Sequence, residues 1–272
     1  MIRFLIIGLA ALLTALPLAG PAAGEEAEAG GYFVALGDSY SSGEGVEPYD
    51  PESGDCRRSA GAYPSLAAGQ DPAADWTYGF VACSGATTDD VNGPDATGQA
   101  HMVEELGVSV RLVTITIGGN DARFADMLRR CALGSMPCTE ENDNEEAWIE
   151  EEVRPRLKAT YARLRAASEP ARIVVVTYPH IFQTERHCGR EPGIQNDEKA
   201  WIRDRTNQLN DLIDEEATAA DLDVLDVRDA FEGHEICTSE PWTSGWGEPG
   251  AFHPNAAGHE ELARQLVDLL NR

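Results

Sequence analysis

The sequence predicts an α/β domain built on a central, mainly parallel five-stranded sheet, and two patterns indicate this fold class. Short apolar runs of strand length recur along the chain, and longer stretches with helical spacing of apolar residues lie between them. This alternation is typical of parallel sheets, whose consecutive strands are joined by crossing helices. A length of 272 residues with 42% hydrophobic residues suits one domain with a sizeable core.

The elements can be placed in order along the chain. Strands are expected at residues 32–37, 77–81, 112–118, 173–178 and 223–227. Helices are expected at residues 60–68, 121–130, 145–167, 197–218 and 256–270, and Asn255 is placed as the N-cap of the last helix. Active sites in such sheets gather beyond the carboxyl ends of the strands. The chemistry is therefore expected in the segments that directly follow the strands.

The N-terminus has the composition of a signal peptide. An apolar run from Phe4 to about Leu18 follows a single arginine and is followed by small residues. The run contains Pro17 and is shorter than the roughly 20 apolar residues that cross a membrane, so a cleaved signal is favoured over an anchor. Residues 1–29 are expected to be the signal peptide, cleaved after position 23 to 29. Residues 30–272 would then form a secreted, extracellular domain.

The charge limits the possible partners. The chain has 47 Asp and Glu against 21 Lys and Arg, a formal net charge of -26. Such a field repels nucleic-acid phosphates and anionic membrane surfaces. No nucleic-acid partner and no stable membrane insertion are expected, and the protein is expected to be a monomer with a small-molecule partner. No metal site is expected, because no histidine pair has ligand spacing and the acidic clusters lack the glycine-centred calcium-loop pattern.

Six cysteines form an even set in a chain expected to be exported, and none belongs to a Cys-x-x-Cys pair. They are Cys56, Cys83, Cys131, Cys138, Cys188 and Cys237. Disulfides are therefore favoured over a metal or redox site. Cys131 and Cys138 bracket a short loop and are natural partners, and sequential pairing is expected throughout: 56 with 83, 131 with 138, and 188 with 237.

A candidate nucleophile follows the first strand. The segment Gly37-Asp38-Ser39-Tyr40 puts a serine at a strand-to-helix turn, where its hydroxyl can face a cleft. The segment is not a Gly-x-Ser-x-Gly elbow, because Ser41 stands where the second glycine would be. Taken alone, Ser39 is equally consistent with a turn or N-cap serine. Asp38 is expected to bond to backbone in the turn.

A candidate base and candidate oxyanion donors lie elsewhere in the chain. Phe252-His253-Pro254-Asn255 puts a histidine just before the last helix, and imidazole titrates close enough to neutral pH to take a serine proton. The Asn120 amide after the third strand, and the main-chain N–H groups of Gly85 and Ser39, can stabilise an oxyanion. A structural role is expected for His259, and His180 is expected to be solvated. Trp242 and Trp246 either wall an acyl site or close their loop over the core.

On these motifs the sequence resembles the GDSL or SGNH hydrolases. The blocks Gly-Asp-Ser-Tyr, Gly-Gly-Asn-Asp and His-Pro-Asn occur in the family's order, and the matching segments span residues 32–259. The resemblance implies a flavodoxin-like three-layer αβα sandwich and ester hydrolysis through an acyl-enzyme, without a cofactor. It implies that Ser39 is the nucleophile, that His253 is the general base, and that Gly85 and Asn120 contribute to the oxyanion hole.

One position departs from the family pattern. The family usually has an aspartate three residues before the histidine, where it orients the imidazole, and here that position is Gly250. The ring still needs an acceptor for Nδ1–H. A main-chain carbonyl at Gly250 is expected to supply it, and the Glu248 carboxylate is the competing candidate.

The expected function is that of a secreted serine esterase or lipase acting on acyl esters, with lipid esters foremost. The cysteines, the long loop before His253 and the signal peptide resemble the lipases, esterases and phospholipases that actinobacteria secrete. A carbohydrate acetyl-esterase or acyltransferase on the same scaffold is one alternative. A non-catalytic exported binding protein is another, prompted by the missing aspartate.

Overall fold

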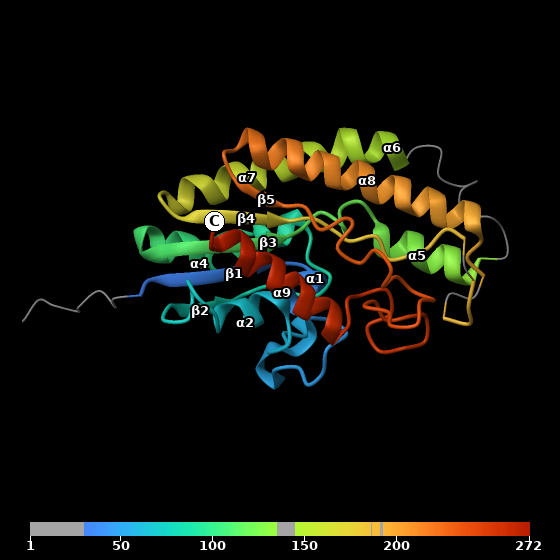
Figure 1. Ribbon diagram of the computed structural model, residues 1–272. Coiled ribbons are helices and arrows are strands. Elements are labelled where there is room, and N and C mark those ends of the chain that lie inside the picture. Colours follow the sequence, from blue (N-terminus) through green and yellow to red (C-terminus); the bar gives the residue numbers. More distant parts are fainter. Residues whose placement is uncertain (1–29, 135–144, 186, 191–192) are drawn as a thin grey trace, which may run out of the picture.

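The computed structural model describes residues 30–134, 145–185, 187–190 and 193–272. Its centre is a five-stranded parallel sheet in the order β2-β1-β3-β4-β5 (Figure 1). The strands are β1 (Tyr32–Gly37), β2 (Thr77–Phe80), β3 (Val110–Thr116), β4 (Arg172–Val176) and β5 (Asp223–Leu225). The predicted parallel sheet is confirmed, and both ends of every strand fall within about two residues of their predicted positions.

Helices connect and cover the strands. They are α1 (Ser39–Ser42), α2 (Tyr63–Ala68), α3 (Thr88–Val91), α4 (Ala100–Leu106), α5 (Phe124–Leu133), α6 (Glu145–Trp148), α7 (Arg154–Ser168), α8 (Asn196–Ala219) and α9 (Ala256–Leu270). A π-helical turn, Ile149–Val153, divides the helix predicted at 145–167 into α6 and α7. The prediction missed the short helices α1, α3 and α4, of four to seven residues, although it found α2, which is equally short.

Alternation along the strands explains the layers. Val34 and Leu36 of β1 belong to a core that packs against α4, α7 and α8, whereas Phe33 and Ala35 belong to a second core that packs against α2 and α9. Successive side chains of a strand point to opposite faces, so a sheet covered on both sides needs apolar residues at every position. Figure 1 shows α7 and α8 above the sheet and α2 and α9 on the other side. The expected αβα sandwich is confirmed.

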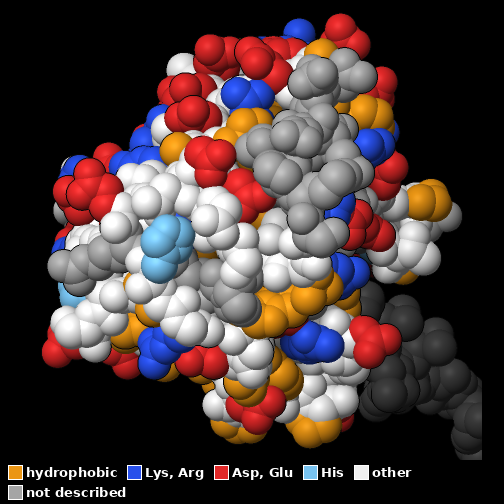
Figure 2. All heavy atoms as spheres, turned by 90° about the vertical axis from the view of Figure 1, so that its right-hand side faces the viewer, with side chains coloured by type: hydrophobic (Ala, Val, Ile, Leu, Met, Phe, Trp, Pro, Cys, Tyr) orange, Lys and Arg blue, Asp and Glu red, His pale blue; other side chains and the backbone are white. Residues whose placement is uncertain are grey.

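The carboxyl ends of the strands carry most of the irregular structure. A third cluster of buried side chains lies there, built from α5, the start of α8 and loops that include Phe182 and Phe252. Figure 2 views this side of the molecule, and acidic side chains crowd its upper part, over α6 to α8. In the part of the chain that the structure describes, no helix is both long and apolar enough to span a bilayer.

Two of the three predicted disulfides lie within the described residues, and both are confirmed. Cys56 is bonded to Cys83, and Cys188 is bonded to Cys237. The predicted partner of Cys131, Cys138, lies outside the described residues. The proposed signal peptide, residues 1–29, also lies outside them, so its cleavage stays a prediction.

Candidate active site

The turn after β1 presents Ser39 at the first position of α1. Asp38 caps the helix, and its carboxylate accepts the main-chain N–H of Tyr40 at 2.9 Å, as expected from the sequence. Gly37 has φ +121°, and a Cβ at this position would lie 2.3 Å from the Thr116 carbonyl oxygen. The chain can therefore turn here only with glycine, against the backbone of β3. Ser39 is left 7% exposed at the cavity described below.

Asp38 also ties the turn to its neighbours through Tyr178, which follows β4. The Tyr178 hydroxyl donates to Asp38 Oδ2 at 2.5 Å and accepts the main-chain N–H of Gly119 at 2.9 Å. Burial raises the pKa of Asp38 to about 7, although the hydrogen bonds from Tyr178 and Tyr40 oppose that shift. Burial likewise raises the pKa of Tyr178 well above its ordinary value, so the phenol keeps its proton and can donate.

His253 meets Ser39 across the cavity. Its Nε2 lies 2.8 Å from Ser39 Oγ, and its Nδ1 lies 3.0 Å from the carbonyl oxygen of Ala251. A carbonyl can only accept, so Nδ1 carries the proton and Nε2 is free to accept the serine hydroxyl. Burial lowers the pKa of His253, which keeps the ring neutral at neutral pH.

Two predictions about the orientation of His253 are corrected. The carbonyl that lies within hydrogen-bond distance of Nδ1, at 3.0 Å, is that of Ala251, whereas the Gly250 carbonyl predicted for this role accepts the main-chain N–H of His253 at 2.9 Å. Glu248 is engaged elsewhere. Its carboxylate accepts the N–H of Gly245 at 2.7 Å and lies 3.4 Å from Arg190 Nε.

Long-range contacts hold the histidine loop. The Tyr40 hydroxyl donates to the Phe252 carbonyl at 2.8 Å, although these residues are 212 positions apart. The main chain of Ser244 exchanges hydrogen bonds with Phe252 and His253 at 2.8 and 2.9 Å. Asn255 caps α9 by accepting the N–H of Gly258, as predicted. His253 is thus held by contacts from α1 and from within its own loop.

The two remaining predicted residues lie at the same cavity. Gly85 follows β2 with φ +80°, a conformation that glycine adopts without strain. The Asn120 amide lines the cavity and donates one N–H to the Ala86 carbonyl at 2.9 Å, and an amide nitrogen carries a second N–H. The structure therefore brings together all four residues that the sequence singled out, from the ends of three strands and the loop before α9.

The cavity has a volume of about 380 Å³ and two chemically different sides. The polar side carries Ser39, Gly85, Asn120 and His253. The apolar side is built by α5, the segment after β4, α8 and the histidine loop, through Phe124, Leu128, Ile181, Ile202, Leu209, Trp246 and Phe252. Of the two tryptophans considered, Trp246 faces the cavity, whereas Trp242 stacks on His234 at 3.7 Å between ring centroids.

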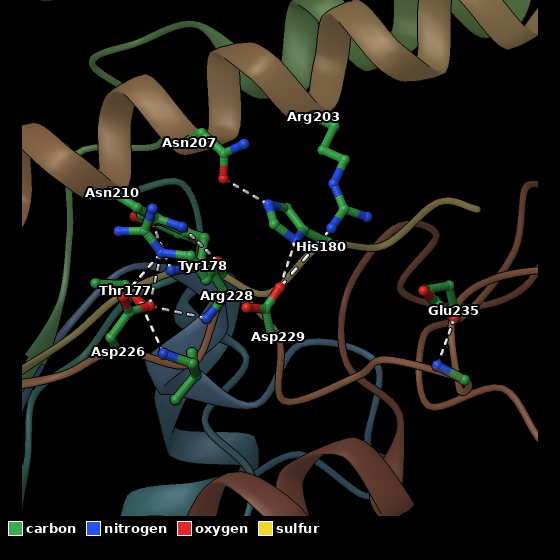
Figure 3. A network of polar contacts seen from close by, with 12 residues as sticks. Thr177, Tyr178, His180, Arg203, Asn207, Asn210, Asp226, Arg228, Asp229 and Glu235 are labelled. Atoms are coloured by element: carbon green, nitrogen blue, oxygen red, sulfur yellow. Dashed lines mark hydrogen bonds and ion pairs between the residues drawn. The ribbon is translucent and has the colours of Figure 1, made fainter. Parts of the chain in front are cut away.

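Figure 3 shows the polar contacts that hold the segment after β4 against α8. Asn210 donates to the carbonyl of Tyr178 at 2.8 Å and accepts its N–H at 3.0 Å. His180 bonds to Asn207 at 2.7 Å and is 7% exposed, so the expectation of a solvated histidine is wrong. His259 has the expected structural role, because it is fully buried and its Nδ1 accepts the N–H of Tyr63 at 3.2 Å.

Sequence reasoning missed three residues that shape the site, namely Tyr40, Tyr178 and Ala251. Tyr178 stands at the carboxyl end of a predicted strand, and this position was the available signal. Within the described ranges, no group of three His, Cys, Asp or Glu side chains could hold a metal ion.

A serine hydroxyl beside an imidazole, in a cavity at the carboxyl end of a parallel sheet, is the arrangement of a serine hydrolase. A family model described as "GDSL-like Lipase/Acylhydrolase family" matches residues 35–261. The chain belongs to this family, and it is a carboxylic ester hydrolase of the lipase and esterase type.

Individual relatives agree with this assignment. The chain is 38% identical to Lipase 1 of Streptomyces coelicolor, over 94% of each chain. Among solved structures, the phospholipase A1 of Streptomyces albidoflavus is 37% identical, with a TM-score of 0.76, over 89% of this chain and 99% of that one. The extracellular lipase of Streptomyces rimosus is 33% identical, with a TM-score of 0.77, over 89% and 98% of the two chains.

Proposed function

We propose that the protein is a secreted serine esterase that cleaves lipid esters through an acyl-enzyme on Ser39. The observation that carries the proposal is the 2.8 Å contact between Ser39 Oγ and His253 Nε2 at the wall of a cavity. A serine hydroxyl is a poor nucleophile until a neighbouring base takes its proton. The neutral ring of His253, oriented by the Ala251 carbonyl, is suited to that task.

Each step of the reaction then has an assigned group. His253 takes the proton of Ser39 while Oγ attacks the ester carbonyl carbon. The oxyanion that forms is stabilised by the N–H groups of Ser39 and Gly85 and by the Asn120 amide, since donors aimed at developing charge lower the barrier. The imidazolium gives its proton to the leaving alcohol, which leaves an acyl group on Ser39. Water attacks this ester with the same base, and Ser39 is regenerated.

A lipid acyl chain suits the apolar side of the cavity. Phe124, Leu128 and Ile202 lie on two helices that face each other beside the polar residues. Burying an acyl chain there is favourable by about 0.8 kcal/mol per CH₂ group. The relatives named above are lipases and a phospholipase A1, which supports the same class of substrate.

The test is hydrolysis of p-nitrophenyl esters from acetate to palmitate by the oxidised mature domain. Ser39→Ala is expected to lower the turnover rate by at least about 10⁴-fold. Ser42→Ala is the matched control, because this hydroxyl lies in the same short helix and donates to the Ser39 carbonyl at 3.4 Å. An activity that Ser39→Ala leaves intact would refute the proposal.

The chain-length profile separates the substrate classes. Maximal kcat/KM at medium or long chains supports lipid esters, whereas activity confined to acetate, and to acetylated sugars in a second assay, supports a carbohydrate esterase. Labelling of Ser39 by a fluorophosphonate requires an activated serine, so a fully unlabelled parent protein would favour a non-catalytic binding protein.

Export and a monomeric state are parts of the same proposal. An extracellular relative and the two disulfides support export. N-terminal sequencing of the protein from culture medium is expected to give a first residue between 24 and 30. Light scattering of the mature domain is expected to give the mass of one chain, and a dimer mass would contradict that part.

A further inference from the structure

One carboxylate in the wall of the cavity has no role in the mechanism above. The oxygens of Glu44 accept hydrogen bonds from Arg57 Nη1 and Ser84 Oγ. The Glu44 side chain is only 13% exposed, and a shielded carboxylate is costly unless such donors satisfy it. Because both oxygens are engaged, the charge is held at one place beside the reacting groups.

Through Ser84, Glu44 reaches the proposed oxyanion hole. Ser84 directly precedes Gly85, and its main-chain N–H donates to the Cys56 carbonyl at 3.0 Å. Cys56 in turn is bonded to Cys83. The hydrogen bond from the Ser84 side chain to Glu44 therefore braces the turn that presents the N–H of Gly85.

The backbone beside Glu44 also packs on the histidine loop. A Cβ at position 250 would lie 2.2 Å from Gly45 Cα and 3.3 Å from the carbonyl carbon of Glu44. A Cβ at Gly45 would lie 3.6 Å from the Cβ of His253. This contact leaves no room at position 250 for the aspartate that SGNH hydrolases usually carry there. The segment that excludes this aspartate, Glu44–Gly45, itself carries a carboxylate at the cavity, that of Glu44.

We propose that Glu44 is a positioning residue for ester hydrolysis, which holds the Gly85 turn and places negative charge beside the imidazolium that forms on His253. The inference rests on the proposed function of Ser39 and His253. The interaction between Glu44 and His253 favours the protonated ring, as this role requires. Burial lowers the pKa of His253, the Glu44 carboxylate opposes that shift, and the Arg57 guanidinium adds to it.

Besides this ion pair, the charges of Tyr40, His259 and Asp38 have to be considered. Tyr40, whose ring centroid is 5.3 Å away, stays neutral because burial raises its pKa. His259 also stays neutral, because burial lowers its pKa to about 3. Asp38 has a pKa of about 7 and titrates in the working range, but its partners Tyr178 and Tyr40 are unchanged in the variants below.

The experiment measures kcat/KM on a short p-nitrophenyl ester, and the rate of fluorophosphonate labelling of Ser39, as functions of pH. Glu44→Gln is expected to lower kcat/KM on the plateau by about tenfold, a loss equivalent to about 1.4 kcal/mol. It is also expected to move the acid limb to lower pH, because the ring loses the charge that favours its protonated form. Glu44→Asp keeps the charge and is expected to keep the acid limb of the parent protein.

Arg57→Gln is expected to shift the acid limb in the direction opposite to Glu44→Gln. Removal of the guanidinium leaves the carboxylate unopposed, so the acid limb is expected to move to higher pH. The matched control is Glu104→Gln, because Glu104 also binds an arginine, Arg163 at 2.7 and 3.1 Å, but lies away from the cavity. This control is expected to leave the profile unchanged.

Two results would overturn the role of Glu44: an acid limb that Glu44→Gln leaves in place, or a shift that Glu104→Gln shares. If Glu44→Gln does not fold, the direction of the Arg57→Gln shift decides alone. Failure of this inference is distinguishable from failure of the proposed function, because the parent protein is labelled at Ser39 in the first case and unlabelled in the second.

Discussion

Ser39, the proposed nucleophile, and His253, the proposed base, stand in regions that are built differently. The Ser39 turn is held from inside the sheet, since Ser41 Oγ accepts the Thr116 N–H at 3.1 Å and the Gln99 amide bonds both main-chain groups of Gly37 at 2.7 and 2.9 Å. The His253 loop is held by Tyr40 of α1, by the bare backbone of Gly45, and by Ser244 of its own loop. The strand pattern points to Ser39 and the His-Pro-Asn motif points to His253, whereas the contacts that hold the His253 loop are visible only in the folded structure.

The largest effect is expected when the proposed base is removed and the turn that carries Ser39 is left unchanged. His253→Ala is expected to lower kcat by about 10⁴-fold, because Ser39 loses its proton acceptor. KM should change little, since the apolar side of the cavity is unaltered. Steady-state kinetics measure this loss, and circular dichroism checks that the variant is folded. A loss of less than about tenfold would show that another group serves as base.

The second effect concerns the nucleophile region and its dependence on pH. Asp38, with a pKa raised from 3.8 to about 7, binds a proton in the native state that the unfolded chain has already released. The free energy of unfolding is therefore expected to fall as pH rises from about 4 to about 7, by on the order of 4 kcal/mol from this group.

Asp38→Asn is expected to remove that part of the pH dependence. Urea unfolding of the parent and the variant at several pH values between 4 and 8 measures the difference in slope. Equal slopes would mean that the native carboxyl titrates like an exposed one.

The third effect tests the close contact in the base region. Gly250→Asp restores the residue type that the family usually has, yet it is expected to destabilise the protein by about 3 kcal/mol, because φ is +65° and Gly45 occupies the space. Thermal unfolding should show a fall of roughly 6 to 12 °C. Gly233→Asp is the control, since it shares a positive φ of +83° but has nothing within 4 Å of its Cβ. Equal losses in both variants would remove the steric argument.

The smallest effect concerns the Tyr178 hydroxyl, which links the turn after β1, at Asp38, to the turn after β3, at Gly119. Tyr178→Phe is expected to cost about 1 to 2 kcal/mol, because the buried Gly119 N–H loses its acceptor and Asp38 loses a donor. Tyr161→Phe is the control, because the buried Tyr161 hydroxyl has no hydrogen-bond partner in the described part of the chain. Denaturant midpoints measure both variants, and a Tyr161→Phe loss as large as that of Tyr178→Phe would contradict the assignment.

Much of the fold could be predicted, because parallel strands are apolar on both faces and read as continuous runs. The sequence also located Ser39, Gly85 and Asn120, since each follows such a run. The orientation of His253 was predicted one residue away, because the choice between the carbonyls of Gly250 and Ala251 depends on the path of a loop. Contacts between distant segments, such as Tyr40 with Phe252, leave no periodic trace in a single sequence.

The Cys56–Cys83 disulfide has a consequence for how the protein is made. Its two cysteines directly adjoin Arg57 and Ser84, the two partners of Glu44. In a chain produced in a reducing compartment, these partners sit on segments without a covalent tie. Oxidation is thus a step in building the reactive cavity as well as a source of stability, and preparations are best compared by their thiol content before they are compared by their activity.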